Sequence, residues 1–203
     1  MSNRSIHTLL KSWDEECPLT REEAVEVLNL PEEEMDSLME CAYALRTKYK
    51  GKKVSVQLLT NVRSGNCTQN CAYCAQSKDS QAEIEKYKRV SDEKLYGDND
   101  LVDEKHLARH CIGLSGIGFS DEEIEDLADR IREMKKKDTQ ICCSIGFLTE
   151  KQARILKDAG LDRINHNLNS SRSFYPEICT THTYDQRVNN IKMLQSLGFE
   201  ICS

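Results

Sequence analysis

The chain has 203 residues, with 34 acidic against 28 basic side chains and a net charge of −6. This acidic balance argues against a nucleic-acid partner, because phosphate neutralisation requires a basic stripe. No apolar stretch reaches the ~20 residues of a membrane span, and the polar start is not that of a signal peptide. We therefore predict a cytoplasmic protein whose ten cysteines bind metal or act in catalysis rather than forming disulfides.

The first part of the chain, residues 1–50, is predicted to be a helical leader. Thr20–Glu23 has the pattern of a capping box and begins a short helix. Pro31 suits the first turn of a second helix, and Gly51 suits its end. A second domain, residues 51–203, is expected to follow.

Strand-like and helical segments alternate in this second domain. Its helices are expected to begin at the capping boxes Ser120–Glu123, Thr149–Gln152 and Thr183–Gln186. The segment 81–109 has a helical composition with a turn-rich interruption at 97–100. The predicted strands are 54–60, 110–115, 140–145, 162–168 and 199–202.

This alternation implies βα units and a parallel sheet, either closed into a barrel or doubly wound. A complete eight-fold βα barrel needs about 250 residues, and the fifth predicted strand is cut short by the end of the chain. The predicted fold class is therefore α/β: a partial TIM-type βα barrel with the helical leader before it. We expect the chain to be truncated, although a partner that supplies the missing strands is an alternative.

Three cysteines, Cys67, Cys71 and Cys74, form a C-x3-C-x2-C motif after the first predicted strand. Four thiolates would complete an iron–sulfur cluster, whereas three leave one iron open to a small molecule. The alternatives are a zinc site or unpaired thiols. Structural zinc usually takes four ligands, commonly in pairs of cysteines, and no second pair follows here. The spacing therefore favours an iron–sulfur cluster.

The alternation of side chains along the predicted strands gives the barrel a polar inner face. The aliphatic face should meet the outer helices, so the polar face looks into the lumen. Polar residues in a lumen that Val, Ile and Leu normally fill indicate a cavity with a ligand. Three thiols meeting there suggest a second metal centre, although buried free cysteines also act as small hydrophobic residues. The lumen-facing set is Cys111, Cys142, Cys202, Asn165, Asn167 and Asn169.

Three asparagines on one strand favour ligand binding over a turn, since Asn is depleted in strands.

The remaining candidates have plainer explanations. His166 falls on the apolar face and is expected to be a packing residue. Arg187, in the first turn of a helix, is by default a surface residue. The cysteines with no convergent context are Cys17, Cys41, Cys143 and Cys179.

Together these motifs resemble the biotin synthases of the radical S-adenosylmethionine (radical SAM) superfamily. The C-x3-C-x2-C motif alone would indicate only the superfamily. Tyr-Cys-Ala-Gln-Ser combined with Asn-His-Asn-Leu is far more specific. The match extends from about residue 50 to the end. Its segments are Ser64–Ser77, Asn165–Leu168, Phe174–Tyr175, Thr181–Tyr184 and Ile201–Ser203.

The resemblance implies an activity. Cys67, Cys71 and Cys74 would hold a 4Fe–4S cluster whose open iron binds S-adenosylmethionine, and reduction would release a 5′-deoxyadenosyl radical. That radical would take hydrogens from two carbons of dethiobiotin, and sulfur from an auxiliary cluster, usually 2Fe–2S, would close the ring of biotin. The implied partners are an electron donor such as flavodoxin or ferredoxin and a second copy of the chain in a homodimer.

The resemblance also implies individual contacts. Asn165 would contact dethiobiotin, and Arg187 would contact the methionine carboxylate of S-adenosylmethionine. Asn167 and Asn169 would bind the ribose, with Tyr73 beside the adenine. The auxiliary cluster would be held by Cys111, Cys142 and Cys202.

Two departures accompany the resemblance. The family usually has Asp where this chain has Asn169, so a charged ribose acceptor becomes a neutral amide. The chain also ends before the Gly-rich segment that follows Cys202 in the family, and before the arginine that ligates the auxiliary cluster. One competing hypothesis is another radical enzyme of the same branch, such as a hydrogenase-maturation or methylornithine-forming relative, which is not expected to carry Asn-His-Asn-Leu with three lumen cysteines. The other is an inactive iron–sulfur-binding remnant.

Overall fold

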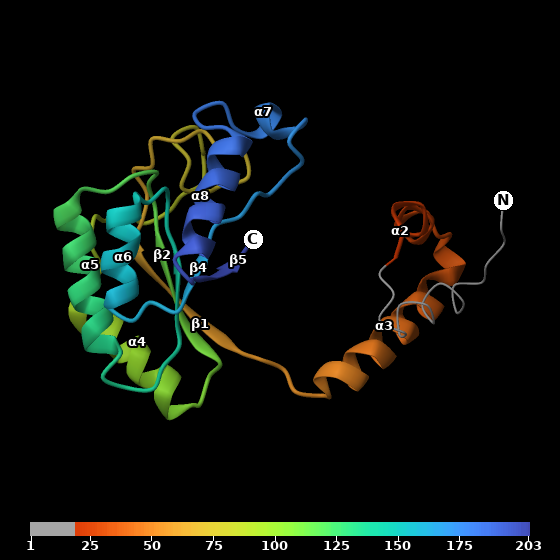
Figure 1. The fold of residues 1–203 in the computed structure, drawn as a ribbon, viewed down its shortest axis with the longest axis horizontal. Coiled ribbons are helices and arrows are strands. Elements are labelled where there is room, and N and C mark those ends of the chain that lie inside the picture. Colours follow the sequence, from red (N-terminus) through yellow and green to blue (C-terminus); the bar gives the residue numbers. More distant parts are fainter. Residues whose placement is uncertain (1–18) are drawn as a thin grey trace. The chain divides into compact units, whose positions relative to one another are not determined.

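The computed structural model of the chain describes residues 19–203 and comprises two units, Met1–Val54 and Ser55–Ser203 (Figure 1). Cys17, one of the cysteines without an assigned function, lies outside the described residues. Among the described residues, no helix combines the length and the apolar character needed to cross a membrane.

The first unit contains the two predicted helices, and both are confirmed. The capping box begins the first helix, because Thr20 Oγ1 accepts a hydrogen bond from the Glu23 amide and the Glu23 carboxylate accepts one from the Thr20 amide. Gly51, with φ 63°, ends the second helix. The elements are α2 (Arg21–Leu28), the 3-10 turn η1 (Glu32–Glu34) and α3 (Met35–Lys50).

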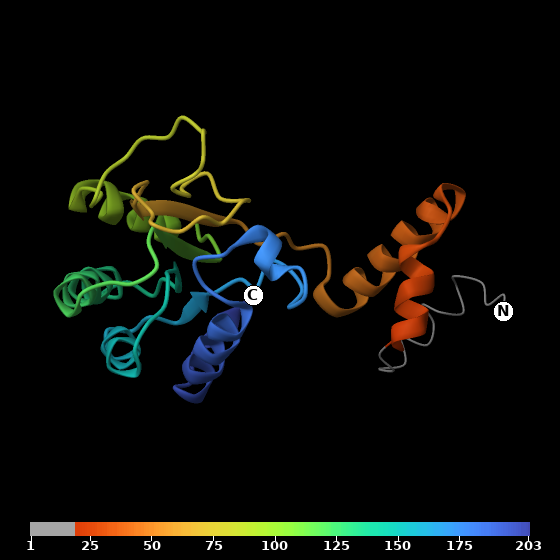
Figure 2. The same ribbon diagram turned by 90° about the horizontal axis from the view of Figure 1, so that it is seen from above.

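The second unit is built on a parallel sheet of five strands that pair in the order of the sequence, so β1 and β5 are the edges. Figures 1 and 2 show its long helices covering one side of the curved sheet. The predicted fold class, a partial TIM-type βα barrel, is confirmed. The strands are β1 (Gln57–Arg63), β2 (Arg109–Leu114), β3 (Ile141–Ser144), β4 (Arg163–Asn165) and β5 (Glu200–Cys202). The helices are α4 (Asp92–Glu104), α5 (Asp121–Met134), α6 (Glu150–Asp158), α7 (Tyr175–Ile178) and α8 (Tyr184–Ser196).

In-register pairing sorts the side chains of the sheet into rows. The row that faces the helices is Thr60, Ile112, Cys143, Ile164 and Ile201. Its aliphatic members and Cys143 pack in one hydrophobic core with residues of the covering helices: Ile124, Leu127, Ile131, Leu156 and Leu194. Cys143 is fully buried there, which confirms it as a packing residue.

The prediction for the segment 81–109 is wrong in two respects. Residues 81–90 are not helical, and α4 runs without a break through 97–100. Asp98 and Asn99 are turn-forming types, but both are buried and their side chains have tertiary partners. Thr60 Oγ1 donates to Asp98 Oδ2 at 2.6 Å, and Asn99 Nδ2 donates to the Met134 carbonyl at 3.1 Å. These contacts replace the local backbone bonds that favour a turn.

The boundaries of the first and fourth strands differ most from prediction. The first strand extends three residues past its expected end at residue 60. The fourth ends at Asn165 instead of residue 168, and Asn169 adopts a left-handed φ of 63° beyond it. Asn167 and Asn169 therefore lie on a loop and not on the strand that carries Asn165.

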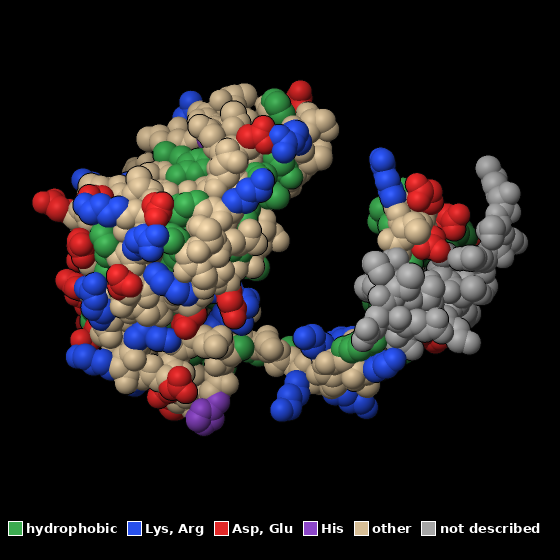
Figure 3. Space-filling view, viewed as in Figure 1, with side chains coloured by type: hydrophobic (Ala, Val, Ile, Leu, Met, Phe, Trp, Pro, Cys, Tyr) green, Lys and Arg blue, Asp and Glu red, His purple; other side chains and the backbone are tan. Residues whose placement is uncertain are grey.

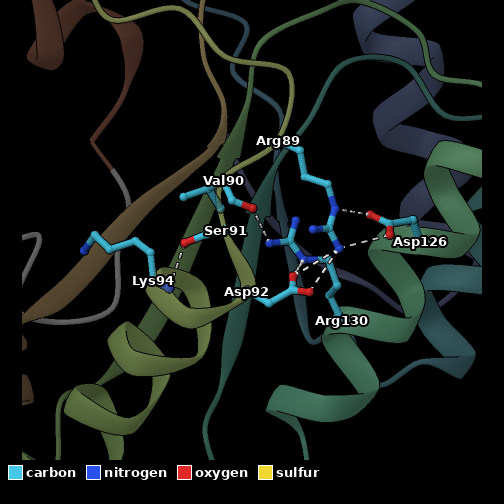
Figure 4. Close-up of polar contacts among 7 residues, drawn as sticks. All are labelled: Arg89, Val90, Ser91, Asp92, Lys94, Asp126 and Arg130. Carbon is cyan, nitrogen blue, oxygen red and sulfur yellow. Dashed lines mark hydrogen bonds and ion pairs between the residues drawn. The ribbon is translucent and has the colours of Figure 1, made fainter.

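A buried arginine connects the start of α4 to α5 (Figure 4). Arg130, on α5, is 3% exposed, and its Nε lies 2.9 Å from Asp92 Oδ1. It also donates to the Val90 carbonyl at 2.9 Å. Arg89 pairs with both Asp92 and Asp126, at 3.0 and 3.1 Å. The alternating charges leave no member of this group, Arg130 above all, buried without a counter-charge.

His110 gives the fold a pH dependence. The ring is fully buried, with Nε2 2.8 Å from Thr60 Oγ1 and Nδ1 3.2 Å from Asn99 Oδ1. Burial lowers its pKa to about 4, against about 6.5 for an unfolded histidine.

We expect the free energy of unfolding to fall as the pH is lowered from 6.5 towards 4, because the unfolded chain then binds a proton that the folded chain does not. The His110 contribution, of order 3 kcal/mol, is fully present above the unfolded pKa. Urea unfolding at several pH values should give a flatter profile for His110→Gln than for the parent. The comparison separates His110 from His166 and His182, which are also buried. Parallel profiles would contradict the assignment.

Candidate functional site

The cysteine motif lies on an irregular loop that follows β1 at the carboxyl edge of the sheet. Gly65 and Asn66 both adopt left-handed conformations, with φ of 69° and 52°, and this turns the chain away from the strand. The Gly65 carbonyl accepts from Ser115 Oγ at 2.6 Å, and its amide donates to Gln76 Oε1 at 2.7 Å. Side-chain bonds thereby hold a loop that has no regular secondary structure.

The three cysteines of this loop line a cavity of about 360 Å³. The cavity lies at the carboxyl ends of the parallel strands, where barrels of this type bind their ligands. It gathers eight of the eleven residues that were assigned a role: Cys67, Cys71, Cys74, Tyr73, Asn165, Asn167, Asn169 and Arg187. Asn167 and Asn169 reach it from the loop after β4.

One row of the sheet lines this cavity: Asn61, Gly113, Ser144 and Asn165 are in register across β1 to β4. A Cβ on Gly113 would lie 3.1 Å from Asn61 Oδ1. Glycine at this position therefore leaves space for the Asn61 side chain and adds no side chain of its own to the cavity wall. Among the described residues, the buried Oδ1 of Asn165 has no hydrogen-bond partner. An orphaned acceptor is costly to bury, so this oxygen is open to a donor from a water molecule or a ligand.

Arg187 is not the surface residue that its place in a helix suggested. Its Nε donates to Tyr175 Oη at 2.6 Å and lies 3.0 Å from His182 Nε2, and the residue lines the cavity. Across the cavity, Asn169 Nδ2 donates to Tyr73 Oη at 2.7 Å. His166 packs as predicted, buried with its ring centroid 5.4 Å from that of Phe147, but neither ring nitrogen has a hydrogen-bond partner among the described residues.

A joint between two distant loops was missed by the sequence patterns. Asn70, between two cysteines of the motif, accepts at Oδ1 from the amides of Thr180 and Thr181, at 3.0 and 3.3 Å, and from Thr181 Oγ1 at 3.1 Å. Its Nδ2 donates to Thr180 Oγ1 at 2.7 Å. The cysteine loop is thereby tied to the segment that begins α8.

Cys179 was assigned no convergent context, and that prediction is wrong. It is buried, with its Sγ 3.8 Å from Cys71 Sγ and 3.3 Å from His182 Nδ1. Burial and the adjacent Cys179 raise the pKa of Cys71 to about 11. Nothing in the cysteine spacing connects positions so far apart in the sequence. The only signal was that residues 181–184 belong to a motif of the resemblance.

The other three candidate cysteines share a face of the sheet, as their alternation predicted. Cys111 and Cys142 are in register on β2 and β3, and Cys202 is in register with Asn165. Arg163, on β4, is in register with Cys142, and β4 lies between the strands that carry Cys142 and Cys202. Burial, and then Cys111, raises the pKa of Cys142 to about 12. These thiols lie outside the cavity lining, one row nearer the amino ends of the strands for Cys111 and Cys142.

The Asn70 joint leads to a test. Asn70→Ala removes the four side-chain hydrogen bonds to Thr180 and Thr181, so we expect the free energy of unfolding to fall by about 2 kcal/mol and the amides of Thr180 and Thr181 to exchange their hydrogens faster. Asn70→Asp keeps a carbonyl-type acceptor and should retain most of the amide protection. Hydrogen exchange measured by mass spectrometry checks both variants. Equal exchange rates in Asn70→Ala and the parent would contradict this role.

Comparison with known proteins places the chain in a family. A family model described as the radical SAM superfamily matches residues 61–203. The biotin synthases of Bacillus subtilis and Geobacillus kaustophilus are 40% and 39% identical over 186 residues. The alignments cover 91% of this chain and 56% of each relative, so the chain spans little more than half of their length. The resemblance to biotin synthases is confirmed.

Solved structures agree on the fold. Methylornithine synthase superposes with a TM-score of 0.84 at 17% identity, over 95% of this chain and 57% of that one. The FeFe-hydrogenase maturase HydG from Carboxydothermus hydrogenoformans gives 0.79 at 20% identity, over 97% and 47%. At such identities the likeness concerns the fold alone. With a family match that covers most of the βα unit and includes the cysteine loop, the chain belongs to the radical SAM superfamily.

Proposed function

We propose that this chain carries the chemistry of a biotin synthase, a radical S-adenosylmethionine enzyme that inserts sulfur into dethiobiotin. One observation carries the proposal: the three thiols of the C-x3-C-x2-C loop and the orphaned amide oxygen of Asn165 line the same cavity. A metal centre and a polar substrate group can then meet at one place. The cytoplasm is the proposed location.

Cys67, Cys71 and Cys74 would hold the 4Fe–4S cluster. Their donor set fits, because thiolates are the ligands of iron–sulfur clusters and three of them leave one iron for S-adenosylmethionine. The loop gives these thiols a fixed base through Asn70 and Gln76. When bound and reduced, the cluster and S-adenosylmethionine together supply a radical that removes hydrogen from an unactivated carbon.

Arg187 would bind the methionine carboxylate. Its Nε is committed to Tyr175 and His182, so the terminal nitrogens are the groups that reach a carboxylate. Asn167 and Asn169 would bind the ribose hydroxyls, to which a neutral amide can both donate and accept. Tyr73, held by Asn169, would lie beside the adenine.

Asn165 would orient dethiobiotin. Its free Oδ1 can accept a hydrogen bond from an N–H of the ureido ring, which satisfies the orphaned acceptor. Gly113 and Ser144, which are adjacent on β2 and β3, have small side chains and leave room for the substrate on this face of the sheet. These residues position the substrate and exclude water, while the cofactors supply the difficult chemistry.

Cys111, Cys142 and Cys202 would hold the auxiliary 2Fe–2S cluster as the sulfur source. Their shared face supports this, and so does Arg163, in register with Cys142 and ion-paired with Glu200, because its positive charge partly offsets the burial that raises the pKa of Cys142. Flavodoxin or ferredoxin is the proposed electron donor, and a homodimer is the proposed assembly.

Anaerobic reconstitution with iron and sulfide tests the proposal. We expect about four irons from the first cluster and about two from the auxiliary one. Replacing Cys67, Cys71 or Cys74 by alanine should remove the iron of the first cluster. Replacing Cys111, Cys142 or Cys202 by alanine should remove the iron of the auxiliary cluster. Cys143→Ala, in the core, is the matched control and should keep both.

Turnover then tests the substrate. With a strong reductant and S-adenosylmethionine, formation of 5′-deoxyadenosine should rise when dethiobiotin is added and should fall at least tenfold in Asn165→Ala. Binding of zinc without uptake of iron would contradict the radical chemistry. Iron loading with no response to dethiobiotin would contradict only the substrate.

A further inference from the structure

Cys179 lies beside a predicted cluster ligand, although the proposed chemistry gives it no task. The residue is 3% exposed, and its sulfur is 3.8 Å from Cys71 Sγ. His182 and Cys179 together with Cys71 bring three potential metal-binding atoms within 4.8 Å of one another. The group is either a separate site for one metal ion or a hydrogen-bonding arrangement around the cluster ligand.

The sulfur separation alone does not decide between them. Two thiolates on one tetrahedral zinc, with Zn–S of about 2.3 Å, lie about 3.8 Å apart, which equals the observed distance. A metal site through these residues would also need the Nδ1 of His182, since that nitrogen faces Cys179 at 3.3 Å. The protonation of His182 is therefore the deciding feature.

Arg187 fixes that protonation. Its Nε–H is a permanent donor and lies 3.0 Å from His182 Nε2, and Tyr175 Oη lies 3.0 Å from the same nitrogen. Nε2 must therefore be the accepting nitrogen, which leaves the proton on Nδ1. Nδ1–H then faces the acceptors Gln69 Oε1, at 3.0 Å, and Cys179 Sγ. A metal at Nδ1 would push the proton to Nε2, against the guanidinium.

The thiol proton of Cys179 has three neutral acceptors in reach besides Cys71. His182 Nε2, at 3.8 Å, already accepts from Arg187. Asn70 Oδ1 already accepts three hydrogen bonds, more than its two lone pairs accommodate well. Thr181 Oγ1, at 3.5 Å, is a neutral hydroxyl. In the structure Cys71 Sγ is the donor and Cys179 Sγ the acceptor. As a thiolate ligand Cys71 could only accept, so cluster binding would reverse this hydrogen bond, and a charged acceptor binds a donor more strongly than a neutral one.

We propose that Cys179 is a positioning residue that donates its S–H to the thiolate of Cys71 and so raises the reduction potential of the cluster. Hydrogen bonds to cluster sulfurs raise the potential because they stabilise the more negative, reduced state. His182 helps to orient the donor, because its own Nδ1–H is shared between Gln69 Oε1 and the Cys179 sulfur, and Arg187 fixes His182. The inference rests on the proposed cluster at Cys67, Cys71 and Cys74.

The test is a redox titration of the reconstituted full chain, followed by electron paramagnetic resonance. A Cys111→Ala/Cys142→Ala background removes the proposed auxiliary cluster from the signal. We expect Cys179→Ala and Cys179→Val to have a more negative potential, with a reduced-to-oxidised ratio about tenfold lower at a fixed potential, or ~59 mV for one electron. Cys179→Ser restores a donor and should lie near the parent. Cys143→Ala, the matched buried thiol, should not change the potential.

Equal potentials in the parent, Cys179→Ala and Cys179→Val would overturn the inference and leave the proposed function standing. Loss of the cluster in both of these variants would overturn it too, because Cys179 would then be a ligand and not a donor. If the parent takes up no iron, the proposed function and the inference both fail. Cobalt(II) gives an independent arm: tetrahedral binding by Cys67→Ala/Cys74→Ala that is lost on adding Cys179→Ala would assign a separate metal site and overturn the inference.

Discussion

The parallel register of the sheet is the constraint on which both the core and the candidate site depend. In one row Ile112, Cys143 and Ile164 face the helices, and in the next Gly113, Ser144 and Asn165 face the cavity. A slip of one residue in any strand would exchange the two faces of that strand. The hydrophobic energy that buries the aliphatic row therefore also fixes the heights at which the polar side chains stand in the cavity.

The sheet alone does not assemble the site, since six of its assigned residues come from loops: the three motif cysteines, Tyr73, Asn167 and Asn169. Loops of this kind carry many backbone groups that need partners. Asn70 and Ser115 supply such partners from side chains, at distances of 2.6 to 3.3 Å. The site thus combines a rigid base with loops held by a few specific hydrogen bonds, and removing one of those bonds affects the loops before it affects the sheet.

The sequence was sufficient for those parts of the site that obey a local rule. Capping boxes located helix starts, alternation separated Cys142 from Cys143, and the motif spacing singled out the loop. It failed where tertiary partners override local preference. Asp98 and Asn99 form a helix because their side chains are bonded to Thr60 and Met134, and Arg187 turns inward because Tyr175 and His182 accept or orient its guanidinium. No periodicity encodes such pairs.

Cys179 illustrates the limit most sharply, because its chemistry depends on a residue 108 positions away in the sequence. Its neighbours act in a chain: Arg187 fixes the protonation of His182, and His182 faces Cys179, which faces Cys71. Arg187 is also the residue proposed to bind the carboxylate of S-adenosylmethionine. The hydrogen bonds that orient the guanidinium for the cofactor are therefore the same ones that orient a donor towards the cluster ligand. A change at Arg187 must therefore alter the hydrogen bonding of Cys179, and the reverse, because the neutral His182 ring has one N–H donor and one acceptor nitrogen, and each of these nitrogens contacts one of the two residues.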